Sequence, residues 1–141
     1  MKRNLIIAGA IIVIFAISIY VSHRQAIRQQ RQLEIRARHI LVQVDRTDPV
    51  KQAQALEKAK DLRERVVAGE DFAAVAREHS DDVMTAPLGG DLGYMELDDL
   101  EEAFKEALLN LEPGEISDVV ETSYGYHIIQ VLDKREPVSR S

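Results

Sequence analysis

The chain has 141 residues, of which 45% are apolar, and it contains no cysteine. This length suffices for one modest domain with additional segments, and the lack of cysteine excludes disulfides, a thiolate nucleophile and a cysteine metal site. The net charge is unevenly distributed, because residues 1–34 carry +4 and residues 35–141 carry −10. Phosphate binding requires a basic surface, so we expect no nucleic-acid partner for the acidic part.

The N-terminus contains an uninterrupted apolar run, LIIAGAIIVIFAISIYV, at residues 5–21. A helix of this length spans about 26 Å, just enough for the hydrocarbon core of a bilayer. The run predicts a single-pass membrane anchor over residues 1–21. A cleaved signal peptide is the alternative, although the following YVSHR is a poor cleavage site. Basic residues lie on both sides of the run, so charge by itself leaves the orientation open.

The next segment, residues 22–35, is polar, rich in Gln and Arg, and free of Gly and Pro. It predicts a solvated helical stalk. We expect the folded domain at residues 36–136 and a short tail at 137–141. The domain begins with ARHILVQV, whose β-branched content predicts a strand.

Two helices are predicted after this strand. In TDPVKQAQALEKAKDLRERVVAG, Asp48 is a natural N-cap, Pro49 suits the first helical position and Gly69 follows the end. The apolar positions with helical spacing are Ala53, Leu56, Ala59, Leu62 and Val66. A second, shorter helix, DFAAVAREHS, is expected to bury Phe72, Val75 and Ala76.

The glycine-rich GGDLGY, residues 89–94, predicts a tight backbone corner with a short strand in it or after it. Asp98 and Glu101 are then spaced as in a capping box and predict the start of a third helix. ISDVVET and GYHIIQVL follow as two strands joined by a short turn. This order predicts an α+β domain with a mixed or antiparallel sheet.

Two of the four histidines, His39 and His127, lie inside apolar strands. His39 shares a strand face with Leu41, and His127 shares one with Ile129 and Val131. A single histidine in such a place is usually a satisfied core residue, but two of them beside the acidic HSDD and a glycine corner favour a functional site. No close histidine pair suggests a metal site, and no G-x-S-x-G motif suggests a serine hydrolase.

The stretches RHILV, DFAAVAREHSDD, TAPLGGDLGY, AFKEALLNLEPGEIS and SYGYHIIQVLDKR occur in this order. Together they resemble the parvulin-type (rotamase) peptidyl-prolyl cis-trans isomerases over roughly residues 36–135. The resemblance implies a parvulin-like four-stranded antiparallel sheet wrapped by helices, here preceded by a single transmembrane helix. It implies no cofactor and no metal.

The resemblance also assigns residues to the site. It implies that His39 and His127 are the paired histidines at the floor of the site, that Asp82 occupies a position where relatives carry Asp or Cys, and that Thr122 supplies a hydroxyl linked to the pair. These four are the candidate catalytic residues. The candidate substrate-binding residues, which would grip the proline ring, are Leu92, Leu100 and Phe104. The glycine corner would then aim Leu92 into the pocket, while Asp91 would tie the loop by bonding nearby backbone N–H groups.

The predicted function is peptidyl-prolyl isomerisation of X-Pro bonds in unfolded or exposed polypeptide segments, assisting folding at the membrane. By analogy with anchored bacterial relatives, the domain is expected on the extracytoplasmic side. Two alternatives stay open: a membrane-tethered chaperone or binding module with little catalysis, and an accessory subunit that uses the domain as an interaction surface. The oligomeric state is left open.

Overall fold

A computed structural model describes residues 2–31 and 33–136 of the chain. The chain forms two units, Met1–Gln32 and Leu33–Ser141. The first contains one helix, α1 (Lys2–Arg31). The predicted tail at residues 137–141 lies outside the described residues.

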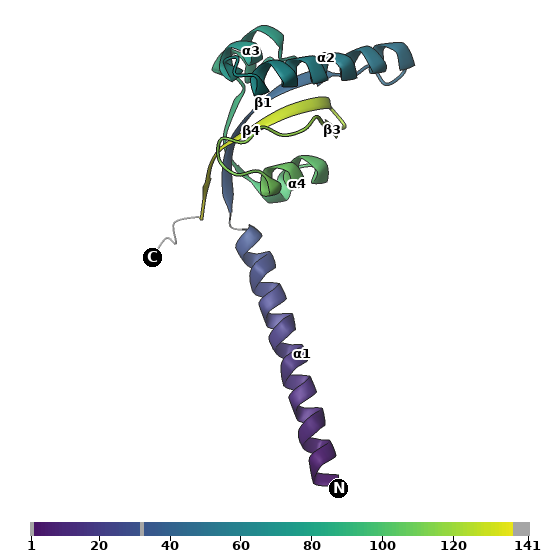
Figure 1. Ribbon diagram of the computed structural model, residues 1–141, viewed down its shortest axis with the longest axis vertical. Helices are drawn as coiled ribbons and strands as arrows, with labels where there is room; N and C mark the ends of the chain where they lie inside the picture. Colours follow the sequence, from purple (N-terminus) through teal and green to yellow (C-terminus); the bar gives the residue numbers. More distant parts are fainter. Residues whose placement is uncertain (1, 32, 137–141) are drawn as a thin grey trace. The chain divides into compact units, whose positions relative to one another are not determined.

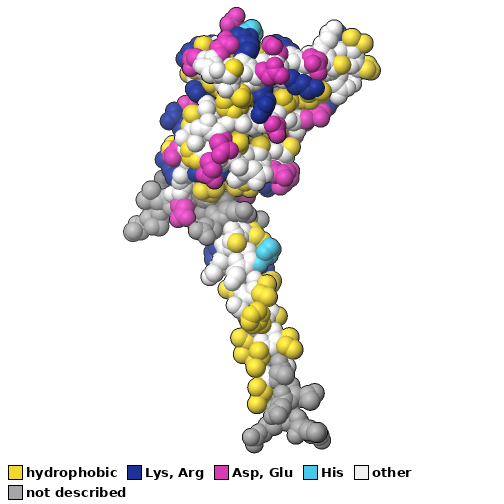
Figure 2. All heavy atoms as spheres, in the orientation of Figure 1, with side chains coloured by type: hydrophobic (Ala, Val, Ile, Leu, Met, Phe, Trp, Pro, Cys, Tyr) yellow, Lys and Arg dark blue, Asp and Glu magenta, His cyan; other side chains and the backbone are white. Residues whose placement is uncertain are grey.

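Helix α1 is continuous through the apolar run and into the polar segment that follows it. Within the described residues, it is the helix long and apolar enough to cross a membrane, with the qualifying stretch at Gly9–Arg28. The apolar side chains of this stretch are exposed (Figure 2). The stretch overlaps the predicted run at residues 5–21, and α1 ends at Arg31, within the segment expected to be the stalk. An uncleaved anchor and a signal sequence share these properties.

The second unit is built on a four-stranded sheet in the order β2-β1-β4-β3. Every neighbouring pair is antiparallel, which confirms the parvulin-like arrangement. The two long strands lie in the centre of the sheet. The strands are β1 (Glu34–Gln43), β2 (Asp91–Glu96), β3 (Val120–Thr122) and β4 (Gly125–Arg135).

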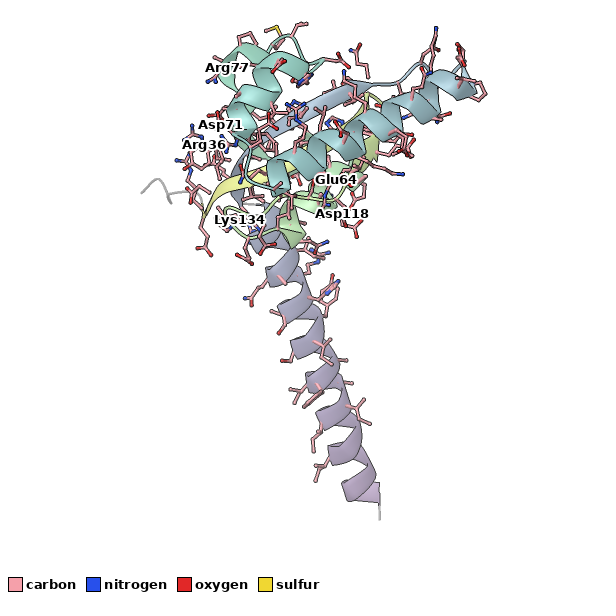
Figure 3. All side chains as sticks on the ribbon, turned by 45° about the horizontal axis from the view of Figure 1, so that its top comes forward. Arg36, Glu64, Asp71, Arg77, Asp118 and Lys134 are labelled. Atoms are coloured by element: carbon pink, nitrogen blue, oxygen red, sulfur yellow. The ribbon has the colours of Figure 1, made fainter. Side chains whose placement is uncertain are left out.

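Helices cover both faces of this sheet. Figure 1 shows α2 and α3 on one face and α4 on the other. The helices are α2 (Pro49–Val67), α3 (Phe72–His79) and α4 (Glu102–Asn110), with short 3-10 turns η1 (Ala86–Leu88) and η2 (Leu97–Asp99). Charged side chains such as Glu64 of α2 and Arg77 of α3 lie on the surface (Figure 3).

Strand alternation separates two apolar cores, because successive side chains of a strand point to opposite faces. Ile40 and Val42 of β1 pack with the apolar residues of α2 and α3. Ile35 and Ala37 of β1 pack with those of α4, together with Ile129 and Val131 of β4. The odd-numbered residues of both central strands thus face α4, and this places His39 and His127 on the α4 side of the sheet.

The predicted start and end of α2 are confirmed. The Asp48 carboxylate accepts hydrogen bonds from the backbone N–H groups of Val50 at 2.9 Å and Lys51 at 3.3 Å, and Pro49 is the first helical residue. Gly69 follows the end with a positive φ of 109°. One predicted apolar position is wrong, because Ala53 is exposed and Ala55 takes a buried place instead.

The predicted capping box of the third helix is also wrong. Helix α4 begins only at Glu102, because Leu97–Asp99 forms the separate turn η2 and Leu100 is extended. The Glu101 carboxylate accepts hydrogen bonds from the Ser123 N–H at 2.9 Å and from its hydroxyl, instead of capping its own helix. This long-range contact forms in place of the local one, and Leu100 packs partly buried against the core cluster that contains α4 residues.

The strand expected over residues 116–122 is shorter than predicted. Only Val120–Thr122 forms β3, and Ile116 makes an isolated bridge to Gln130. The Ser117 hydroxyl accepts the N–H of Ile129 at 2.9 Å. A side-chain group therefore replaces a ladder hydrogen bond at this point and interrupts the strand.

Candidate active site

A pocket of about 470 Å³ opens on the α4 side of the sheet. Its lining comes from β1, the α3–β2 connection, β2, the start of α4 and the β3–β4 hairpin. All seven predicted site residues line it: His39, Asp82, Leu92, Leu100, Phe104, Thr122 and His127. The fold therefore brings together residues that lie far apart in the sequence.

The register of β1 and β4 pairs the two histidines. His39 lies opposite Ile129, and His127 lies opposite Leu41, so the two histidines are diagonal neighbours on one face. Their rings stack with centroids 5.2 Å apart at an interplanar angle of 19°. The two Nδ1 atoms are 3.0 Å apart, within hydrogen-bonding distance. Both residues are buried, at 5% and 4% exposure.

The Nε2 atom of each imidazole also lies within hydrogen-bonding distance of a polar side chain. His39 Nε2 lies 2.7 Å from Asp82 Oδ2. His127 Nε2 lies 2.6 Å from the Thr122 hydroxyl, which also accepts the backbone N–H of Tyr124 at 3.2 Å. The buried pair thus ends in a carboxylate on one side and a hydroxyl on the other.

These contacts define one direction for the whole chain of hydrogen bonds, because each neutral imidazole has one donor and one acceptor nitrogen. The ionised Asp82 can only accept, so His39 donates from Nε2 and accepts at Nδ1. His127 must then donate from Nδ1 and accept at Nε2, where the Thr122 hydroxyl donates. Every member of this chain is satisfied with both rings neutral.

The electrostatic environment supports the neutral pair. Burial, with the adjacent His39 ring, lowers the pKa of His127 to about 4. Burial also lowers the pKa of His39, and the Asp82 carboxylate offsets only part of that shift. Burial acts to raise the pKa of Asp82, but hydrogen bonds from Thr85 and His39 outweigh it, and the pKa stays below its usual value. At neutral pH both imidazoles are therefore uncharged beside an ionised carboxylate.

An apolar wall stands against the histidine pair. Phe104 of α4 meets both imidazoles edge-on, with ring centroids 6.1 Å from His39 and 5.2 Å from His127. Leu92 and Leu100 are partly buried against the core cluster that contains Phe104. The pocket thus combines a polar floor and an apolar wall, which is typical of sites that bind an apolar ring and orient a polar group beside it.

The glycine corner brings β2 close to β1. Gly90 has φ 82°, and a Cβ at this position would lie 2.2 Å from the carbonyl oxygen of His39, so only glycine fits. Gly90 also accepts the backbone N–H of His39 at 2.9 Å. Asp91 accepts the N–H of Gly93 at 2.8 Å, as predicted, and also pairs with Arg36.

Two residues that support the pocket were not predicted from the sequence. The Thr85 hydroxyl donates to Asp82 Oδ2 at 2.6 Å, and Glu101 holds Ser123 beside Thr122. An Asp followed three residues later by Thr is a common turn spacing, and this signal was present for Thr85. Glu101 carried no such local signal, because its partner lies 22 residues away. Among the residues that the structure describes, no group of three His, Asp or Glu side chains is arranged to hold a metal ion.

Comparison with known proteins places this chain in a family. The model of the PPIC-type PPIASE domain matches residues 19–135. The Chaperone SurA of Nitrosococcus oceani is 40% identical over 109 residues, covering 77% of this chain and 25% of that protein. The Foldase protein PrsA of a Geobacillus species is 41% identical over 103 residues, covering 73% of this chain and 33% of that protein. The chain thus spans a quarter to a third of the length of these curated relatives.

A solved structure shows the same fold. The crystal structure of a PpiC-type peptidyl-prolyl cis-trans isomerase domain superposes with a TM-score of 0.72 at 28% identity, covering 79% of this chain and 99% of that one. The sheet order, the pocket with its paired histidines and these similarities lead to one conclusion: the chain belongs to the parvulin family of PPIC-type peptidyl-prolyl cis-trans isomerases.

Proposed function

We propose that this chain is a membrane-anchored isomerase that turns X-Pro bonds in unfolded or exposed polypeptide segments and assists folding on the extracytoplasmic side. In this proposal residues 1–21 are the anchor, 22–35 the stalk and 36–136 the isomerase domain. The observation that carries the proposal is the neutral, fully hydrogen-bonded pair of His39 and His127 beneath the apolar wall of the pocket.

Rotation about an X-Pro bond is slow because it breaks amide resonance, with a barrier near 20 kcal/mol. The twisted amide is less charge-separated than either planar form, so a water-poor pocket with neutral walls favours it. In the proposed mechanism Leu92, Leu100 and Phe104 bind the proline ring, and the imidazoles of His39 and His127 form an uncharged polar floor under the amide. No covalent bond to the substrate is needed.

Asp82 and Thr122, which end the buried chain of hydrogen bonds, have different proposed roles. Asp82 fixes the tautomer of His39 by accepting its Nε2–H, and Thr122 fixes that of His127 by donating to its Nε2. A floor whose donors and acceptors are fixed in advance costs no reorganisation when the amide twists. These residues therefore act on the transition state through the orientation of the imidazoles.

Exchange NMR on a short X-Pro peptide tests the activity directly. We expect substoichiometric full-length chain in detergent micelles to produce cis–trans exchange peaks that are absent without protein. His79→Ala serves as the matched control, because His79 on α3 does not line the pocket, and this variant should keep the activity. A folded wild-type chain that leaves the exchange rate unchanged would refute the enzymatic proposal.

A second candidate function is a tethered chaperone that holds proline-containing segments with little turnover. This candidate is supported by the names of the two relatives, one of which is called a chaperone and the other a foldase. The same NMR sample separates the two functions. A chaperone would shift the peptide resonances on binding without accelerating the exchange, whereas an isomerase does both.

The proposed anchor and orientation can be tested with single cysteines, because the chain has no native cysteine. We would label Lys2→Cys and Glu57→Cys in intact cells with a membrane-impermeant maleimide. The extracytoplasmic placement predicts labelling at position 57, on the exposed surface of α2, and none at position 2. The reverse pattern would contradict the orientation. Loss of the N-terminal segment from the mature chain would show a cleaved signal instead of an anchor.

A further inference from the structure

Thr85, in the loop between α3 and β2, makes contacts that no part of the proposed mechanism uses. Its hydroxyl donates to Asp82 Oδ2 at 2.6 Å and lies 3.3 Å from His39 Nε2. Its backbone carbonyl accepts the N–H of Gly90 at 2.8 Å. Thr85 does not line the pocket, so direct contact with a substrate does not explain these interactions.

These bonds close a ring around His39. Thr85 binds Asp82 through its hydroxyl and Gly90 through its carbonyl, while Asp82 binds the His39 side chain and Gly90 binds the His39 backbone. The side chain and the main chain of His39 are thus located by two groups that are both held by Thr85. A displacement of Thr85 moves both partners of this histidine together.

The hydroxyl also determines which direction the buried hydrogen-bond chain takes. A protonated Asp82 could donate to His39 Nε2, and this would reverse the tautomers of both histidines. Donation from Thr85 occupies Oδ2 as an acceptor, and the Met84 N–H occupies Oδ1 at 3.2 Å. Both oxygens of the carboxylate then act as acceptors. His39 Nε2 therefore continues to donate to Asp82.

We infer that Thr85 is a positioning residue for isomerisation, which acts through Asp82 to hold His39 as the Nε2–H tautomer and His127 as the Nδ1–H tautomer. The inference rests on the proposed isomerase function for its effect on rate, but the tautomers can be observed without any activity. Because Thr85 acts outside the pocket, its loss should lower kcat and leave KM for the peptide nearly unchanged.

The test compares Thr85→Val, which removes the hydroxyl at nearly constant shape, with Thr85→Ser, which restores it. The matched control is Thr47→Val, because the Thr47 hydroxyl makes the same kind of bond to Asp45 at 2.6 Å and neither residue lines the pocket. We expect kcat to fall about three- to tenfold in Thr85→Val, to recover in Thr85→Ser and to stay unchanged in Thr47→Val. An unchanged kcat in Thr85→Val, or an equal loss in Thr85→Ser, would overturn the inference.

Nitrogen-15 NMR of the imidazoles gives a readout that a merely structural role would not move. The wild-type chain should show His39 protonated at Nε2 and His127 at Nδ1, and Thr85→Val should show a mixture of tautomers. The reverse tautomers in the wild-type chain would overturn the inference even if the valine variant did not fold. If the wild-type chain shows these tautomers but no isomerase activity, the proposed function is refuted, whereas a tautomer mixture in Thr85→Val would still support the role of Thr85 in holding the tautomers.

Discussion

Acidification should destabilise the folded domain through the buried histidine pair. In the folded state the pKa of His127 drops from 6.5 to about 4. Between these two pH values His127 is protonated in the unfolded chain but not in the folded chain. The free energy of unfolding therefore decreases as the pH falls through this window. The contribution is fully present above the ordinary pKa and is fully lost below the folded-state pKa.

The size of the effect follows from the shift. Each pKa unit corresponds to 1.36 kcal/mol, so the whole shift is worth about 3.4 kcal/mol, of which about 2.5 kcal/mol is lost by about pH 4.5. The pKa of His39 is lowered as well and adds a loss of the same sign. Glu101 and Asp82 act in the opposite sense on His127, but burial dominates. A loss of this size is a large part of the stability of a small domain.

Urea unfolding followed by tyrosine fluorescence, at about pH 7, pH 5.5 and pH 4.5, measures this loss. Protonation of carboxylates whose pKa is lowered in the folded state also destabilises the domain on acidification. The informative quantity is therefore the difference between variants in how much the free energy of unfolding decreases. His127→Gln should be less stable at pH 7 but should show a smaller decrease, whereas His79→Gln should decrease as the wild-type chain does. An equal decrease in His127→Gln and the wild-type chain would refute the idea that a neutral buried His127 carries the effect.

Three further predictions concern the pocket. His127→Ala and Asp82→Ala should each lower the isomerase rate at least about tenfold, or about 1.4 kcal/mol, while circular dichroism still shows a folded domain; unchanged rates in both variants would contradict the assigned roles. Phe104→Ala should weaken peptide binding in a titration and also reduce stability, by less than the roughly 3–5 kcal/mol of a fully enclosed aromatic ring, and an unstable variant with full affinity would make Phe104 a core residue only. Residues 96–106 contain six acids, two of which line the pocket, and together they would form an acidic rim. Peptides with Lys or Arg before proline should therefore be the best substrates at low salt. A substrate ranking that does not depend on charge would contradict the acidic rim.

Many features of this protein could be predicted from the sequence because they depend on neighbouring residues. Asp48 caps α2 with a carboxylate that reaches only two and three residues along the chain. The alternation of side chains along β1 and β4 predicted that His39 shares a strand face with Leu41 and that His127 shares one with Ile129 and Val131. The glycine corner indicated a tight bend of the backbone, and Gly89, Gly90 and Gly93 have the positive φ angles of such a bend. The resemblance to the parvulin isomerases, and not the strand pattern, supplied the pairing of the two histidines.

Only the tertiary structure decided the features that depend on distant partners. The bond between His39 and His127 joins residues 88 positions apart, and the strand register brings them within reach. The start of α4 was mispredicted because Glu101 binds Ser123, 22 residues away, a contact that a local capping pattern cannot anticipate. The direction of the hydrogen-bond chain, with Thr85 at its end, follows from which donors and acceptors the fold buries together. A sequence specifies each polar group, but the cost of leaving a buried group unpaired acts only once the fold has removed water from it.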